Sequence, residues 1–126
     1  EDMKLIWSPE NASKAYIATL ESITTHPIHQ SGVAEFLSAM AAGWTAQLIV
    51  ETWSRGVPTA ASVGLAVAAC VTEGRHACVV SDESSKRDHV EAMRAAGVPV
   101  PEYVVGDSGE VVDGEEVRGV DFLVVD

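Results

Sequence analysis

The sequence predicts an α/β protein built on a parallel sheet, and three observations support this expectation. Short apolar runs at 46–50, 76–81, 102–105 and 120–125 are typical of buried strands. Segments of helical composition follow the first two runs, and glycine, proline or acidic residues punctuate the chain between elements. Alternation of strands and helices implies parallel strands joined by right-handed crossovers.

A helix is expected before the sheet, beginning at Ser8-Pro9-Glu10 and running to about Ser22. The serine is a cap, proline suits the first helical position, and the acid favours the first turn. The stretch 24–32 reads as a loop. Its two histidines, His26 and His29, lack a third ligand nearby, so no metal site is predicted.

A second helix is expected at 33–42, with Gly43 as its stop. Helical spacing predicts that one apolar stripe of this helix faces the core. That stripe comprises Val33, Phe36, Leu37, Met40 and Ala41.

The stretch 46–56 is the expected centre of the sheet. Its apolar run ends at Glu51 and passes into a polar turn that contains Trp53 and Gly56. A helix at 59–71 follows, in which Gly64 is expected to let the backbone lie close to the sheet. Parallel sheets bind ligands at the carboxyl ends of their strands, so this turn is the first place to look for a site.

The second strand is expected to run from His76 to Ser81, with Asp82 after it. Ser84 or Ser85 is expected to cap the next helix, which Gly97 ends. A third strand at 102–105, a loop or short helix at 108–117 and a fourth strand at 120–126 complete the chain.

The 126 residues predict a single domain, with helices at 1–45 and a βαβαββ core at 46–126. The 19 acids and 8 bases give a net charge of −11, which argues against nucleic acid or an anionic membrane as a partner. Cys70 and Cys78 lie in apolar runs and read as core residues, which favours a reducing compartment, the cytoplasm or the nucleus. No apolar run approaches the roughly 20 residues of a membrane span.

Each of the four predicted strands ends in or beside an acid: Glu51, Asp82, Asp107 and Asp126. Acids gathered at one edge of a sheet suit a ribose diol, an ammonium group or a divalent metal ion. The alternative is that each acid caps the helix that follows it, where the helix dipole favours negative charge. Both interpretations remain open for each acid, and the repetition favours a ligand site for the group.

Several segments carry a resemblance to a known fold. The stretches 74–82, 91–98, 104–107 and 120–126 resemble class I S-adenosylmethionine-dependent methyltransferases, especially the catechol-type O-methyltransferases. The stretches 5–10, 38–44 and 50–56 more closely resemble a plant family of unknown function with that methyltransferase-like, Rossmann-like fold. The resemblance covers nearly the whole chain and implies the strand order 3-2-1-4, as in the N-terminal part of that fold.

The resemblance also implies roles for individual residues. Glu51, with Trp53 and Gly56 in the following turn, would form the cofactor loop. Asp82, or less directly Glu83, would bind the ribose hydroxyls, and Asp107 would lie beside the adenine. Asp126 matches the acid near metal or substrate and is the one catalytic candidate. S-adenosylmethionine is the cofactor that the resemblance implies.

The chain departs from the methyltransferase pattern in two respects, the glycines of the cofactor loop and the ribose acid. Trp53 stands where the pattern has a glycine that lets the backbone approach the cofactor, and Gly56 falls one place early. Asp82 falls two residues after the usual position of the ribose acid. Two functions are therefore carried forward: a methyltransferase acting on a small molecule, and a non-catalytic module that binds a ligand or a protein.

Class I methyltransferases continue beyond the fourth strand, with a further strand beside it. An apolar fourth strand left at the edge of a sheet is a liability that proteins normally avoid. We therefore expect either that the natural protein continues past Asp126 or that a partner covers this edge. A second copy of the chain is one candidate partner.

Overall fold

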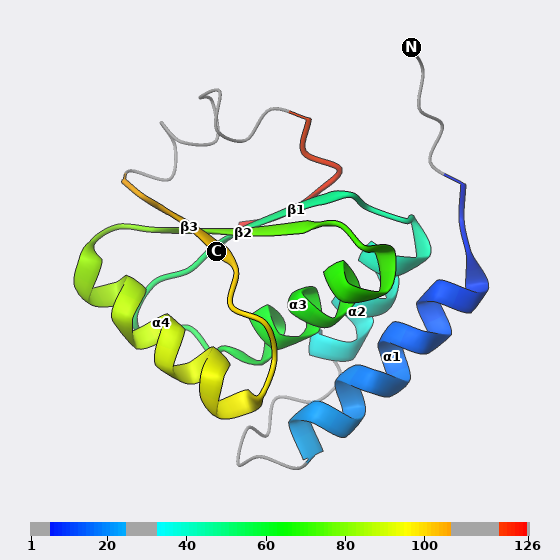
Figure 1. Cartoon of the computed structure of the whole chain (residues 1–126), viewed down its shortest axis with the longest axis horizontal. Helices are drawn as coiled ribbons and strands as arrows, with labels where there is room; N and C mark the ends of the chain where they lie inside the picture. Colours follow the sequence, from blue (N-terminus) through cyan, green and yellow to red (C-terminus); the bar gives the residue numbers. More distant parts are fainter. Residues whose placement is uncertain (1–5, 25–32, 107–118, 126) are drawn as a thin grey trace.

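The computed structural model describes residues 6–24, 33–106 and 119–125 (Figure 1). The expectations for His26, His29, Asp107 and Asp126 fall outside these residues. The helices are α1 (Pro9–Thr24), α2 (Val33–Gly43), α3 (Ala60–Thr72) and α4 (Glu83–Ala96). The strands are β1 (Leu48–Thr52), β2 (Arg75–Val80), β3 (Glu102–Val105) and β4 (Phe122–Val124).

The four strands form one sheet in the order β3-β2-β1-β4, and every pairing is parallel. The α/β fold class and the strand order are thus confirmed. Glu51 lies inside β1 and is paired in register with Cys78 of β2. Ile49, two residues earlier, is paired with His76 on one side and Phe122 on the other.

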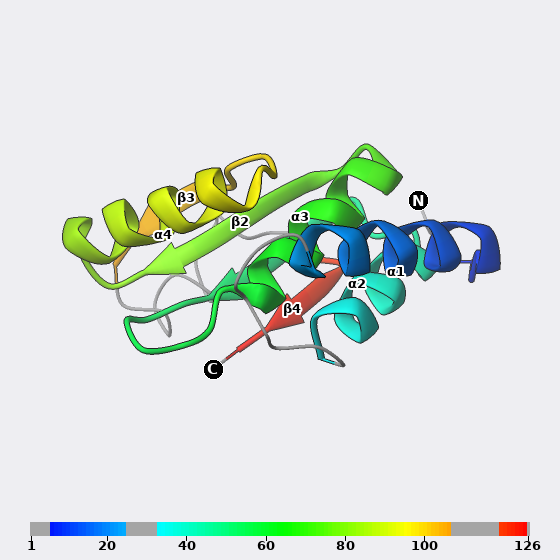
Figure 2. The same cartoon turned by 90° about the horizontal axis from the view of Figure 1, so that it is seen from below.

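All four helices lie on the same face of the sheet (Figure 1). Helix α4 contacts β2 and β3. Helices α1, α2 and α3 pack against one another at the other end of the same helical layer (Figure 2). Ile49 of β1 is buried under this layer with Leu65 and Ala68 of α3. No helix within the described ranges is both long and apolar enough to cross a membrane.

The close approach at Gly64 is to helix α2, so the expectation that it serves the sheet is wrong. A Cβ atom at Gly64 would lie 2.4 Å from the backbone oxygen of Ala34 and 3.4 Å from the Cβ of Ser38. The two helices therefore touch through backbone, which leaves room only for small residues between them.

This contact also overturns part of the predicted apolar stripe of α2. Val33 and Phe36 are 63% and 59% exposed, whereas Ala41 of the stripe is buried and Leu37 packs against the core. Ala34 and Ser38, which lie outside the predicted stripe, are buried where α2 meets Gly64. Helical spacing alone does not distinguish these two faces.

Three helix ends agree with the expectations from the sequence, and one differs. Ser8 Oγ accepts a hydrogen bond from Asn11 N at the start of α1, as expected for a cap. Glu73 and Gly97 adopt left-handed conformations after α3 and α4. The cap of α4 is Asp82, whose Oδ1 accepts from Ser85 N at 2.7 Å, so the assignment of that cap to Ser84 or Ser85 is wrong.

Candidate functional site

A buried carboxylate, Glu51, is the centre of a network of polar side chains between the sheet and the helices. The residue is 3% exposed. Its Oε1 accepts a hydrogen bond from Ser62 Oγ of α3 at 2.6 Å. Its Oε2 lies 2.6 Å from Nε2 of His76, on β2. Both oxygens therefore have partners from neighbouring elements, as a buried charge requires.

The network continues through His89 of α4. Its Nε2 lies 2.9 Å from Ser62 Oγ, and its Nδ1 lies 2.6 Å from the Tyr103 hydroxyl of β3. The thiol of Cys78 on β2 lies 3.8 Å from the same Nε2. The connected polar side chains thus come from three strands and two helices.

The Ser62 hydroxyl donates to Glu51 Oε1, and the other hydrogen-bond directions follow from that bond. Because the Ser62 proton is used, its oxygen accepts from His89 Nε2–H. His89 Nδ1 then accepts from the Tyr103 hydroxyl. With Glu51 as the acceptor of both of its hydrogen bonds, His76 Nε2 donates to Oε2. In this assignment every proton of the network is directed toward Glu51.

The surroundings favour the neutral forms of the other groups. Burial lowers the pKa of His89, a shift that the nearby Glu51 charge partly opposes. Burial raises the pKa of the Cys78 thiol well above its ordinary value, and the Glu51 charge adds to this effect. Burial likewise raises the pKa of Tyr103. Burial therefore favours the uncharged forms of His89, Cys78 and Tyr103.

Three of these residues have ligand atoms close enough to hold a metal ion. One atom each of Glu51, Cys78 and His89 lies within 4.8 Å of the others, and all three residues are buried. Metal binding would require the Cys78 thiolate, which burial disfavours, and would displace the bond between His89 and Ser62. The arrangement fits a hydrogen-bonded core better than a metal centre.

Trp53 follows β1 and turns inward instead of projecting from the sheet edge. Its indole nitrogen donates to the Val57 oxygen at 3.0 Å, and its ring meets that of His89 edge to face at 4.9 Å between centroids. Gly56, in the same loop, has a positive φ of 95° and open space around its missing side chain. The indole thus supports the loop from beneath.

The loop is also tied to the start of α4. Arg55 Nε lies 2.6 Å from Asp88 Oδ2, and the same guanidinium donates to Ser84. Asp82 is engaged as the helix cap, and the hydrogen bond from Ser85 lowers the pKa of its carboxyl. Asp82 therefore already performs the capping role that the sequence offered as the alternative to ligand binding.

A cavity of about 210 Å³ opens beside this loop at the carboxyl edge of β1 and β4. Glu51 and Trp53 line it together with Val57, Pro58 and Val124. The N-terminal part of α2, including Val33 and Leu37, forms another wall. Apart from Glu51, the lining side chains are apolar.

The structure brings Glu51 and Trp53 together at this cavity and places Gly56 in the adjoining loop. The sequence reasoning missed Ser62, His76, His89 and Tyr103. One signal was available: His76 and Cys78 alternate along a strand beside Glu51, which places polar and thiol side chains on one buried face. The contributions of α3 and α4 had no comparable signal.

Several solved structures resemble this fold, including the following two. The first, a crystal structure of cofactor-bound Rv0187 from MTB, has a TM-score of 0.61 and 20% sequence identity, covering 88% of this chain and 52% of the other. The second is the O-methyltransferase TomG from Streptomyces achromogenes, involved in tomaymycin synthesis and solved in complex with SAM. It has a TM-score of 0.57 and 22% identity, covering 97% of this chain and 55% of TomG.

The chain therefore has a methyltransferase-like fold and spans about half the length of these two proteins. No curated protein matches the sequence. A family model described as "Protein of unknown function (DUF1442)" matches residues 3–126. The chain belongs to this DUF1442 family of proteins of unknown function.

Proposed function

We propose that this chain binds S-adenosylmethionine at the carboxyl edge of its sheet, as the cofactor-binding part of a methyltransferase-like protein acting on a small molecule. The observation that carries the proposal is the position of Glu51. Its buried carboxylate lines an otherwise apolar cavity at the edge where parallel sheets bind ligands. A carboxylate in such surroundings favours a cationic group.

Trp53 also favours a cationic group in this cavity. Its ring lines the cavity beside Glu51, and the face of an indole attracts a cation. S-adenosylmethionine carries two cationic groups, a sulfonium and an ammonium. The residue that breaks the methyltransferase glycine pattern is thus compatible with the positively charged part of this cofactor.

The size of the cavity limits how the cofactor fits. At about 210 Å³ it is smaller than the roughly 300–1,000 Å³ of ordinary ligand sites. It suits the charged part of the cofactor, with the nucleoside lying outside it along Gly56 and the start of α4. Bound S-adenosylmethionine supplies a transferable methyl group, and Glu51 and Trp53 would orient its charged end.

Isothermal titration of the full chain with S-adenosylmethionine and S-adenosylhomocysteine tests the proposal. We expect micromolar binding of S-adenosylmethionine and weaker binding of S-adenosylhomocysteine, which lacks the sulfonium charge. Trp53→Leu should weaken S-adenosylmethionine more than S-adenosylhomocysteine, whereas Glu91→Gln on the exposed surface of α4 should change neither. Absence of binding at millimolar ligand would overturn the proposal.

A second candidate is a non-catalytic module that binds a ligand or a protein partner. It is favoured by the engagement of both Glu51 oxygens within the protein and by the exposure of Val33 and Phe36 near the same cavity. Apolar side chains grouped at a cavity mouth suit a partner surface. Cofactor binding without methyl transfer to any of a panel of phenols and catechols would favour this candidate.

A further inference from the structure

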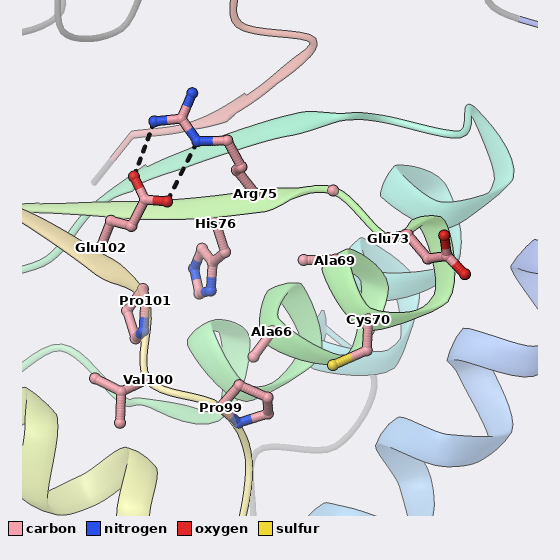
Figure 3. Close-up of a pocket in the computed structure, with 11 residues that line it drawn as sticks. Ala66, Ala69, Cys70, Glu73, Arg75, His76, Pro99, Val100, Pro101 and Glu102 are labelled. Atoms are coloured by element: carbon pink, nitrogen blue, oxygen red, sulfur yellow. Dashed lines mark hydrogen bonds and ion pairs between the residues drawn. The ribbon is translucent and has the colours of Figure 1, made fainter.

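A second cavity lies at the opposite end of the sheet from the carboxyl edge. It has a volume of about 370 Å³ and lies among the starts of β2 and β3, the last turns of α3 and the segment 99–101 (Figure 3). This volume is within the range of sites for small organic molecules. None of the residues proposed above for the cofactor lines it.

His76 lines this cavity and carries a buried, unpartnered nitrogen. Its side chain is 5% exposed, and Nδ1, which is itself covered, has no hydrogen-bond partner among the described residues. Figure 3 shows the ring extending from β2 toward Ala66 and Pro101, between the sheet and α3. Buried polar atoms in native proteins are nearly always hydrogen-bonded, so a ligand that enters the cavity and moves its lining aside would satisfy this nitrogen.

Glu51 determines which partner that nitrogen needs. In the hydrogen-bond assignment given above, Glu51 Oε2 accepts from His76 Nε2 at 2.6 Å. In a neutral imidazole with a protonated Nε2, Nδ1 is an acceptor. The partner must therefore donate an O–H or N–H. A carboxylate behind a histidine also fixes the orientation of the ring.

The other lining residues determine which ligand shape and polarity suit the cavity. Ala66, Ala69, Pro99, Val100 and Pro101 line the cavity and offer flat apolar surface. Arg75 and Glu102 at its border are paired with each other at 2.8 Å and point away from the helices (Figure 3). This pair neutralises its own charge, and Glu73, which also lines the cavity, disfavours an anionic ligand, so an uncharged ligand suits the lining.

We propose that this cavity binds a small, uncharged aromatic molecule carrying an O–H or N–H group, which donates a hydrogen bond to His76 Nδ1. Phenols and indoles are the chemical classes that meet these requirements. The site is distinct from the S-adenosylmethionine site, because different residues line the two cavities.

Indole and benzofuran form a matched pair of probes, since they share shape and aromaticity but only indole has an N–H donor. Titration of the full chain, followed by amide NMR, should give a dissociation constant about tenfold lower for indole, the effect of one hydrogen bond to a buried acceptor. Shifts should concentrate at Ala66, Ala69, His76 and Val100. Equal affinity for the two probes, shifts centred on Trp53 and Val57, or no binding at millimolar indole would each overturn the proposal.

Cys70 offers a test that needs no substitution. It is exposed and lines the cavity, where its thiol points toward the segment that contains Pro99 (Figure 3). Saturating indole should slow its alkylation by N-ethylmaleimide several-fold, as measured by intact mass. Cys78 is buried and should remain unmodified in the folded protein. An unchanged rate at saturating indole would contradict the assigned position.

His76→Phe then tests the acceptor itself. The substitution keeps an aromatic ring but removes Nδ1, so indole should lose its advantage over benzofuran. Val90→Ala on α4, outside this cavity, is a control expected to keep that advantage. Persistent preference for indole in a folded His76→Phe variant would overturn the proposal. The wild-type measurements decide the question if that variant does not fold.

Discussion

The Glu51 carboxylate and the His76 imidazole, 2.6 Å apart, connect the two cavities of this protein. Glu51 lines the cavity at the carboxyl edge of the sheet, and His76 lines the cavity at the other end. One buried hydrogen bond therefore separates the proposed cofactor site from the proposed aromatic site. This pair also anchors the polar network that joins β1 and β2 to α3.

Glu51→Gln should destabilise the fold. The amide has one acceptor oxygen for two donors, so either Ser62 or His76 is left without its partner in the core. An unsatisfied buried donor costs about 1–3 kcal/mol. Urea unfolding should show this loss, with Glu91→Gln on the exposed face of α4 as the control within about 0.5 kcal/mol of wild type. Equal stability of the two variants would contradict the network.

His89 should make stability depend on pH. Burial lowers the pKa of His89 in the folded state below the ordinary value of 6.5, so the unfolded chain takes up its proton first as pH falls. The free energy of unfolding should therefore decrease as pH drops below about 6.5. His89→Gln removes the titration and should give a flatter profile in this range. Equal slopes for the two proteins in urea melts between about pH 5 and 7 would contradict the assignment.

Gly64→Ala tests the close packing of α2 on α3. Helix propensity alone would give a gain of about 1 kcal/mol, whereas a methyl group 2.4 Å from the Ala34 oxygen forces the helices apart. Overpacking of this kind costs about 1–3 kcal/mol, so the net change should be destabilising. Ala95→Gly on the exposed surface of α4 measures the propensity effect separately. A stabilised Gly64→Ala variant would show that the helices are not in contact there.

The edge strand β4 should promote self-association of the 126-residue chain. Leu123 is 44% exposed, and β4 pairs only with β1 in the part of the chain that the structure describes (Figure 2). Analytical ultracentrifugation should detect dimers or larger species that Leu123→Lys reduces, since a charge on an edge strand opposes pairing. A monodisperse wild-type monomer would contradict this expectation.

The fold could be predicted from the sequence because its signals are local. Apolar runs, the proline-led start of α1 and the stops at Glu73 and Gly97 each depend on neighbouring residues. The packing of α2 could not be predicted this way. Whether Val33 and Phe36 or Ala34 and Ser38 face inward depends on Gly64, which is distant in sequence and adjacent in space.

The candidate site was predicted in part. Glu51 and Trp53 were identified by position at the end of a strand, and both line the carboxyl-edge cavity. Trp53 was expected to form part of the cofactor loop, and its indole contacts Val57 and His89 beneath that loop. His89 could not be identified, because its role depends on the packing of α4 over β2 and α3, which sequence periodicity does not reveal.

The central claim, that Glu51 accepts a hydrogen bond from His76 Nε2 and leaves His76 Nδ1 as a free acceptor, is tested most directly by side-chain ¹⁵N NMR of the histidines at neutral pH. His76 should show a protonated Nε2 and an unprotonated Nδ1, and Nδ1 should shift when indole binds. A protonated Nδ1 would contradict the hydrogen-bond directions of the whole network and the donor chemistry proposed for the ligand.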